Sequence, residues 1–427
     1  MTDKMNLLQL TELPAIKPVR RRGEKQDRSI QRRAQIAEAA IEALALHGVA
    51  GLTHRLVARK AGVSLAATTY YFDSKFDIVA EASRRTLQGY TDAFHRAAAR
   101  FKHEAEGPIQ LREFAARLVR NAVSRDRIRA LCWAEITLDA HRHEETLALT
   151  RQWLEELSGV WLEICEAAGL DRPAETARSA IDLVIGLLLV ATSLGLTADQ
   201  VDLVLECGAD PLVAWTLPQP DMQGIEPQQR ASRKAAATRE KILLAAIDTL
   251  IEDGPDAVSY RAIATRAGIA PAGPFYHFPT IDGLLAAAQQ RLFEDSKQRY
   301  RAVASEVGGL LDTERLIDRT STVLVREATE FAGNNLASYS IWLQAARNPE
   351  LRPMVWSAIA DQYVAWRRLI AVLTPDQRPI DALLLFSLFV GKHVRILSAG
   401  SPFEDLTMIR SEFARDISSL VRSEFWF

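Results

Sequence analysis

Basic side chains gather in two places in the chain, and their chemistry suits contact with phosphate groups. Guanidinium and ammonium groups neutralise phosphates, so such arms can follow a nucleic-acid backbone or enter a minor groove. A solvated charged segment would have the same composition, but the recurrence of the pattern favours nucleic acid. The basic residues are Lys17, Arg20, Arg21, Arg22, Lys25, Arg28, Arg32 and Arg33 in the first arm, and Arg230, Arg233, Lys234 and Arg239 in the second.

Patterns typical of enzymes and metal sites are missing from the sequence. It contains no glycine-rich nucleotide loop, no HExxH zinc motif and no GxSxG nucleophile turn. His141, His143 and Glu144 come nearest to a ligand set. Histidines at i and i+2 lie on different faces of a helix, so a solvated helix end explains them better. The sequence therefore predicts no enzyme, no metal and no cofactor.

The composition is that of an ordinary globular protein, with 427 residues, 48% hydrophobic and 25% charged, and a formal net charge of -2. Such a length suggests about two to four domains. Three widely separated cysteines argue against a disulfide framework. The apolar stretches 183–196 and 383–390 are too short to span a bilayer and are expected to be buried helices. The N-terminus lacks the apolar core of a signal peptide, so we expect a cytoplasmic protein without a membrane partner.

The chain repeats itself. Residues 36–82 match residues 242–288 without a gap. A shared bias toward amphipathic helices does not explain the match, because paired glycines and aromatic residues lie outside any helical stripe. A duplication does. The identical pairs include Ile41/Ile247, Leu44/Leu250, Gly48/Gly254, Arg55/Arg261, Ala58/Ala264, Gly62/Gly268, Tyr70/Tyr276 and Phe72/Phe278.

Each copy is expected to form three short helices. In the first copy, an apolar stripe over residues 36–44 predicts a helix that Gly48 stops. Thr53 then caps a helix over 54–61, Gly62 makes the turn, and Ser64 caps a helix over 65–71. Two short helices joined by a glycine-containing turn predict a helix-turn-helix.

The second copy follows the same plan. Thr238 is its expected first cap, Ser259 caps the second helix, Gly268 makes the turn and Pro271 starts the third helix. Long helices begin at Ser74 and Thr280 and lead into regions with almost no strand signal. We expect an all-α chain with two heads and two bodies: a head at 28–82, a body at 83–216, a linker at 217–233, a head at 234–288 and a body at 289–427.

The segments Thr53–Lys75 and Ser259–Phe278 resemble the DNA-binding signature of the Tet-repressor (TetR) family of bacterial transcription regulators. The turn glycine and the closing aromatic residues keep the same spacing in both. The segments 133–145 and 342–353 add support because they lie at similar distances after the two heads, but this support is weaker because such bodies diverge widely in the family. The resemblance implies two tandem TetR-like units that bind an operator in double-stranded DNA.

The resemblance also suggests which side chains meet DNA. Arg55 and Arg261 are the expected readers of bases, with a structural salt bridge as the alternative, and His54 and Tyr260 suit phosphate contact. Phe72 and Phe278 are expected in the core. The other expected DNA contacts are Leu65, Ala66, Thr68, Thr69, Tyr70 and Lys75 in the first head, and Ala272, Gly273, Phe275, Tyr276 and His277 in the second.

The second head departs from the family pattern. The usual tyrosine of the third helix is Thr69 in one copy and Phe275 in the other, and the lysine present as Lys75 becomes Ile281. Pro274 is expected to remove a backbone donor from the third helix. Weaker binding by the second head and an asymmetric or imperfectly palindromic operator follow from these differences.

The bodies are expected to pair within one chain, as a pseudo-dimer, through helices 175–196 and 198–215 against 380–397 and 403–425. Filling each body's own core is the alternative, and a homodimer of such chains stays open. The family also implies a small, apolar effector and a repressor, although an activator is not excluded. The effector contacts expected are Phe114, Trp133, Trp153, Tyr339, Trp342 and Tyr363, with Phe94, Trp161, Phe331, Trp356 and Trp366 nearby.

A rival interpretation is a helical ligand-sensing or interaction protein whose second head has lost DNA binding. The departures at Phe275 and Ile281 keep this alternative open.

Overall fold

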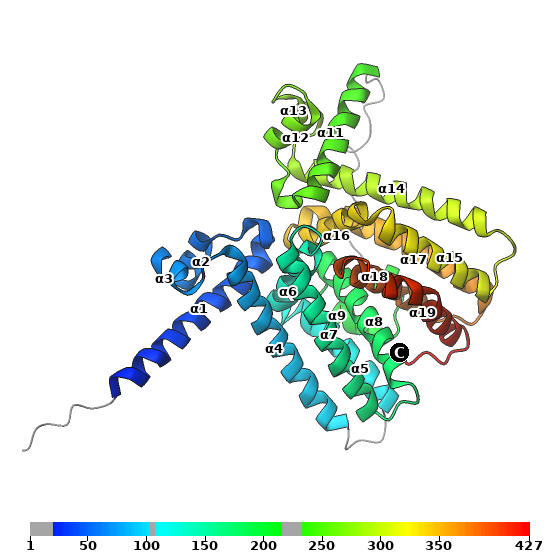
Figure 1. Cartoon of the computed structure of the whole chain (residues 1–427). Coiled ribbons are helices and arrows are strands. Elements are labelled where there is room, and N and C mark those ends of the chain that lie inside the picture. The colour runs from blue at the N-terminus through cyan, green and yellow to red at the C-terminus, as the bar shows by residue number, and fades with distance from the viewer. Residues whose placement is uncertain (1–19, 102–106, 216–232) are drawn as a thin grey trace, which may run out of the picture.

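The computed structural model describes residues 20–101, 107–215 and 233–427, and every element within these ranges is a helix (Figure 1). The expected all-α fold is confirmed. Of the expected linker, only residue 233 lies within the described ranges, as the first residue of a helix.

The first half consists of a head, α1–α3, followed by a body, α4–α10. The bounds are α1 Arg20–Gly51, α2 His54–Ala61, α3 Leu65–Tyr71, α4 Lys75–Phe101, α5 Gly107–Val123, α6 Arg127–Asp139, α7 Glu144–Ala167, α8 Pro173–Leu194, α9 Ala198–Leu205 and α10 Pro211–Ala214.

The second half repeats this order, with a head from α11 to α13 and a body from α14 to α19. The bounds are α11 Arg233–Glu252, the 3-10 turn η2 Pro255–Ala257, α12 Tyr260–Ala267, α13 Gly273–His277, α14 Ile281–Val307, α15 Thr313–Thr329, α16 Ala332–Arg347, the 3-10 turn η3 Pro349–Leu351, α17 Arg352–Leu373, α18 Pro379–Ser398 and α19 Phe403–Val421.

Local signals position the helices of both heads. The hydroxyls of Thr53 and Ser64 each accept a backbone N–H of the helix that follows, at 3.1 and 3.2 Å. Gly62 ends α2 with φ at 63°, in the left-handed region that glycine adopts without strain. Ser259 and Gly268 act in the same way on α12. These five helix boundaries are where the sequence predicts them.

Two expectations about the second head are wrong. Thr238 lies inside α11, where its hydroxyl bonds to a carbonyl of the preceding turn, because the helix already begins at Arg233. The third helix begins at Gly273, after Pro271. Pro274 therefore falls in the first turn, where a backbone N–H has no partner within the helix, and it removes no helical hydrogen bond.

The two bodies meet where α8 crosses α18. A Cβ atom on Gly186 would overlap the backbone carbonyl of Ser387, and one on Gly391 would overlap that of Asp182. Each glycine thus faces the residue one helical turn before the other glycine, as two-fold symmetry requires. This reciprocity pairs Gly186 with Gly391 as equivalent positions of the two halves. The absence of a side chain at both lets the two backbones touch.

A buried ionic cluster lies beside this crossing. The first half contributes Asp182, whose carboxylate receives Lys392 Nζ at 2.8 Å and Arg395 Nε at 2.6 Å. Both cations also reach Glu412, at 3.1 and 2.8 Å. Burial alone would raise the pKa of Asp182, but Arg395 and Lys392 outweigh it and hold that pKa below its ordinary value. Removing one member would leave uncompensated charge in the interior.

The helices around the crossing differ from the expected four-helix seam. In the first half, α9 packs against α5 of its own body, so it fills that body. In the second half, α19 packs mainly on α15 but also reaches α8, where Arg178 lies 3.7 Å from Glu412. By length and composition α8 could cross a membrane, yet 83% of its most apolar window is buried in the protein.

Candidate DNA-contacting heads and effector cavity

The third helix of the first head presents most of its expected contact face to solvent. Leu65 is 46% exposed and Tyr70 is 80% exposed, and Ala66 and Thr69 are also exposed. Thr68 is fully buried and its hydroxyl donates to the Leu65 carbonyl at 2.8 Å, so its expected exposure is wrong. The exposed side chains form one continuous face on α3 that a DNA groove could receive.

Side chains on α2 and at the start of α4 flank this face. Arg55 is exposed, as a base- or phosphate-reading side chain must be. His54 is half-buried, and its Nδ1 has no hydrogen-bond partner among the described residues. Lys75 bonds through Nζ to the Val49 carbonyl at 3.3 Å, so it now stabilises the head itself. Phe72 is 2% exposed and lies in the core as expected.

The second head shows a different face. Tyr276 is 80% exposed and Phe275 is 58% exposed, with Ala272 exposed and Gly273 and His277 half-buried. Arg261 is exposed like Arg55.

The tyrosine on α12 is less free than expected. The Tyr260 hydroxyl donates to the backbone carbonyl of Phe278 at 2.9 Å. Its ring also meets Phe275 edge-on at 5.6 Å. The hydroxyl proton expected to reach a phosphate is thus used within the head.

The basic arms are only partly described. Lys17 and Arg230 lie outside the described residues. Arg28 and Arg32 are exposed. The guanidinium of Arg239 lies over the Phe278 ring at 4.5 Å, which anchors the root of the second arm to the head.

In each body, one arginine donates a hydrogen bond to the head of the other half. Arg142, in the first body, donates to the Leu250 carbonyl at the end of α11, at 2.8 Å. Arg347, in the second body, donates to the Ala45 carbonyl near the end of the straight part of α1, also at 2.8 Å. Carbonyls in the last turn of a helix lack helical partners and attract cations. Both contacts follow the same two-fold relation as the glycine crossing.

Acidic groups complete this junction beneath the heads. Arg347 forms an ion pair with Glu135 on α6, and Arg142 approaches Ser340 at the equivalent position on α16. Burial raises the pKa of Glu135, although Arg347 opposes the shift, and burial likewise raises the pKa of Asp256. Arg347 on α16 is thus the cation that opposes the effect of burial on Glu135.

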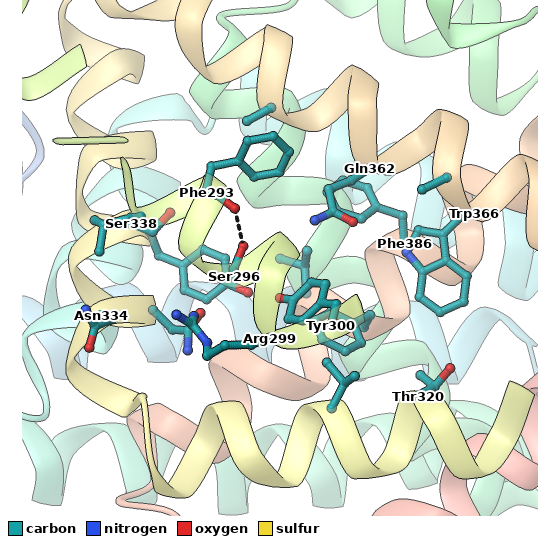
Figure 2. Close-up of a pocket in the computed structure, with 18 of the residues that line it drawn as sticks. Phe293, Ser296, Arg299, Tyr300, Thr320, Asn334, Ser338, Gln362, Trp366 and Phe386 are labelled. Carbon is teal, nitrogen blue, oxygen red and sulfur yellow. Dashed lines mark hydrogen bonds between the residues drawn. The ribbon is translucent and has the colours of Figure 1, made fainter. Parts of the chain in front are cut away.

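The second body contains a cavity of about 230 Å³ between α14, α15, α16, α17 and α18. Figure 2 shows Arg299 and Tyr300 projecting from α14, Ser338 and Asn334 on the side of α16, Thr320 on α15, and Trp366 and Phe386 on the opposite wall. Most of the lining is apolar or aromatic, as in sites for small molecules.

The first body carries large side chains at the equivalent positions. The register set by Gly186 and Gly391 and by Arg142 and Arg347 pairs Trp133 with Ser338 and Trp153 with Ala358. Trp133 and Trp153 are buried and lie 6.4 Å apart. Helices α4 and α14 keep the register of the heads, in which Tyr90 takes the place of Ser296, and Tyr90 packs on Trp153 at 5.9 Å. Three rings thus occupy the space that small side chains leave open in the second body.

Family comparisons divide the chain in the same way. The model described as bacterial regulatory proteins, tetR family, matches residues 36–82 and 242–288. The model described as tetracyclin repressor-like, C-terminal domain, matches residues 106–217 and 311–422. The chain belongs to the TetR family. It is a tandem member, with two DNA-binding helix-turn-helix heads and two C-terminal domains.

Individual relatives of this TetR chain correspond to one half of it. The HTH-type transcriptional regulator BetI of Agrobacterium fabrum is 30% identical over 175 residues, which are 39% of this chain and 82% of BetI. A transcriptional regulator from Rhodococcus sp. Rha1 is 21% identical with a TM-score of 0.38, over 43% of this chain and 96% of its own. The multidrug binding protein EbrR, solved with ethidium, is 26% identical with a TM-score of 0.34, over 42% and 97%.

The expected effector contacts of this TetR chain fall in three places. Tyr339 and Trp342 line the cavity of the second body. Phe114, Trp133 and Trp153 belong to the packed rings of the first body, and Phe114 also borders a polar pocket between α4, α5 and α6. Tyr363 does not line the cavity: its hydroxyl donates to the Pro379 carbonyl at 2.9 Å. Effector binding by any of them stays a prediction.

Sequence reasoning missed the two arginine contacts and the ionic cluster. Arg142 and Arg347 are identical residues in equivalent positions, so a longer alignment of the two halves would have found them. Lys392 and Arg395 interrupt an apolar stretch, which also marks buried charge. The two histidines of the 141–144 segment have separate partners. His143 bonds to Asp139 at 2.7 Å, and His141 lies between two backbone carbonyls.

Proposed function

We propose that this TetR-family chain is a single-chain pseudo-dimer that represses transcription in the cytoplasm until a small effector releases it from DNA. Both heads bind one operator, whose half-sites differ because the faces of α3 and α13 differ. The observation that carries the proposal is the reciprocal crossing of Gly186 and Gly391, which gives one chain the two-fold arrangement that a palindromic site requires.

The ionic cluster supports pairing between unlike halves. The positions equivalent to Lys392 and Arg395 in the first half are Leu187 and Val190, and the position equivalent to Asp182 is Ser387. Two first halves would therefore bury Asp182 without a cation, and two second halves would bury both cations without Asp182. The first pairing leaves Asp182 without a cation, and the second leaves Lys392 and Arg395 only the carboxylates of their own half, so pairing of unlike halves is favoured.

The arginine contacts support coupling between the heads and the effector cavity. The cavity is lined by residues of α14 and α16. The first of these helices begins next to α13, and the second ends at Arg347, which holds the first head. A molecule that shifts either helix would change the spacing of the heads, and DNA binding depends on that spacing.

The test combines stoichiometry with footprinting on the DNA that flanks the gene, at a fixed near-physiological salt concentration. We expect one chain to protect two unlike half-sites about one helical turn apart, or a multiple of it. Light scattering then distinguishes one chain per operator from a pair of chains. Binding that shows no preference for DNA sequence and is lost when salt is added would contradict the proposal.

The second candidate is a protein in which only the first head binds DNA. The internal hydrogen bond of Tyr260 and the short α13 favour it, because both leave the second head fewer polar groups for phosphates. Protection of a single half-site, unchanged by Arg261→Ala and lost in Arg55→Ala, would support this candidate over the pseudo-dimer.

A further inference from the structure

The charged residues that line the cavity of the second body are all positive. Among the described residues that line it, two are arginines, Arg299 and Arg319, and none is an aspartate or a glutamate. Aromatic faces and neutral side-chain acceptors in the lining could surround a cation, but no carboxylate there balances its charge and the two arginines repel it. The state of the two arginines therefore decides which ligand charge the cavity favours.

Arg299 is paired with a carboxylate of the protein. Its Nε and Nη2 atoms donate to the two carboxylate oxygens of Glu327 at 2.6 and 2.7 Å. The guanidinium also lies over the Phe331 ring at 4.2 Å. Glu327 is 1% exposed and receives Asn335 Nδ2 at 2.8 Å as well. This pair is a satisfied structural ion pair, so its charge is balanced within the wall.

Arg319 is different. Its Nη2 donates to the backbone carbonyls of Gly308 and Gly309 at 3.1 and 3.3 Å, which are neutral acceptors. Its Nε is buried and has no hydrogen-bond partner among the described residues, and no described carboxylate lies within ion-pair distance. The half-buried Arg319 therefore places a positive charge without a carboxylate partner, and one unsatisfied N–H, in the wall of a mainly apolar cavity.

A second unsatisfied donor lies in the same lining. The indole Nε1 of Trp342 is buried and has no partner among the described residues, although indole N–H groups in protein interiors are normally paired. Both orphans of the lining are donors, so the missing group is an acceptor. A carboxylate is an acceptor that also balances the charge of Arg319.

Volume limits the rest of the ligand. A dry apolar cavity of roughly 150 Å³ holds benzene, so a cavity of this size takes on the order of ten non-hydrogen atoms. Phe293, Tyr300 and Trp366 supply flat apolar walls. The body of the ligand is therefore an aromatic ring or a medium-length alkyl chain.

We propose that the second body binds a small apolar carboxylate, with its charged end at Arg319, and that the first body does not. This inference rests on the proposed function only in taking the cavity as the effector site. In the first body Tyr90, Trp133 and Trp153 occupy the equivalent space, so one chain binds one ligand molecule.

The test uses the full chain and two matched series of compounds: phenylacetate, phenylacetamide and phenylethylammonium, and octanoate, octanamide and octylammonium. Calorimetric titration at near-neutral pH and fixed salt gives affinity and stoichiometry. We expect each carboxylate to bind about tenfold or more tightly than its amide, because a hydrogen bond to a charged group is the stronger kind, and the ammonium compounds to bind weakest. One molecule should bind per chain.

Three variants sharpen the test. Arg319→Gln should abolish the preference for carboxylate over amide while keeping amide binding. Arg315→Gln, on the same helix but outside the cavity lining, should change nothing and serves as the matched control. Ser338→Trp copies the first body and should block every compound, with its fold checked by circular dichroism and thermal unfolding.

The outcomes are separable from those of the proposed function. Equal affinity for carboxylate and amide, preference for the cation, two molecules per chain, or no binding by either series would overturn the inference. Operator affinity is measured separately by fluorescence anisotropy. If the carboxylate binds but operator affinity is unchanged, the ligand class stands and effector-controlled release falls. If the operator binds but no compound does, the ligand class falls and DNA binding stands.

Discussion

The first body is packed with rings where the second is hollow. Trp153 stands where the second body has Ala358, and Trp133 where it has Ser338. Burying a tryptophan stabilises a core, whereas a cavity weakens it and creates a place for a ligand. A duplicated unit can therefore divide two tasks that a single unit must combine. One copy here has a filled core, and the other has an open space that a ligand could occupy.

The largest expected effect concerns the charge that joins the halves. Asp182→Asn leaves Lys392 and Arg395 buried without their partner from the first body, and we expect a loss of about 3–5 kcal/mol in the free energy of unfolding. Urea unfolding measures it. Asp171→Asn, at an exposed position outside the cluster, is the control. Equal stability of the two variants would mean that the cluster does not hold the halves together.

The glycine crossing gives the next largest effect. In Gly391→Ala the new Cβ overlaps the Asp182 carbonyl, so the helices must separate, at about 3 kcal/mol. Gly159→Ala, in α7 with open space around it, should instead stabilise the protein by about 0.5–1 kcal/mol. Thermal unfolding of both variants tests the contrast. A Gly391→Ala protein as stable as the parent would contradict the close crossing.

A third difference between the halves is a histidine, His393, where the first half has Leu188. Burial lowers the pKa of His393 from 6.5 to about 3, and the Tyr339 hydroxyl lies 3.1 Å from its Nδ1. The imidazole of His393 is protonated more readily in the unfolded chain than in the folded one. Its contribution to the free energy of unfolding is therefore fully present above pH 6.5 and is lost as pH falls. The decline is about 2 kcal/mol by pH 5.

Urea unfolding at pH 8 and pH 5 measures this decline. In His393→Gln the free energy of unfolding should fall by about 2 kcal/mol less between pH 8 and pH 5 than in the parent protein. An equal fall in both proteins would show that another group causes it.

The smallest effect compares the heads. Arg55→Ala should weaken operator binding about tenfold or more if it reads a base, and Arg261→Ala should weaken it less, because the second head offers fewer polar contacts. Arg96→Ala, exposed on α4 outside the head, controls for the loss of one positive charge. Anisotropy titrations at one salt concentration decide the order. A greater loss for Arg261→Ala would reverse the ranking of the heads.

Local features of the fold could be predicted from sequence because they depend on neighbouring residues. Thr53, Gly62 and Ser64 determine the helix-turn-helix through caps and a left-handed turn. Thr68 was misplaced because a helix of two turns gives no periodicity from which to tell its inner face. The prediction that Thr238 caps a helix was wrong because a threonine hydroxyl can equally bond to a carbonyl within a helix.

Long-range features could not be predicted from the same signals. The segment of Trp133 looked similar to the segment that begins at Trp342, yet the structure pairs Trp133 with Ser338. Similar distances from the heads do not fix the register of the two bodies, and contacts between the halves, such as those of Arg142 and Arg347, do. The unpaired Nε of Arg319 depends on packing between helices, which no local pattern reports.

The unlike third helices, α3 and α13, give the proposed pseudo-dimer a direction. A symmetric dimer reads a palindrome identically from either end, so it carries no information about upstream and downstream. A chain with one seven-residue and one five-residue third helix fits a given operator better one way round than the other. Its hollow body would then always lie toward the same side of the promoter, and a gene on that side would meet the ligand-controlled end first.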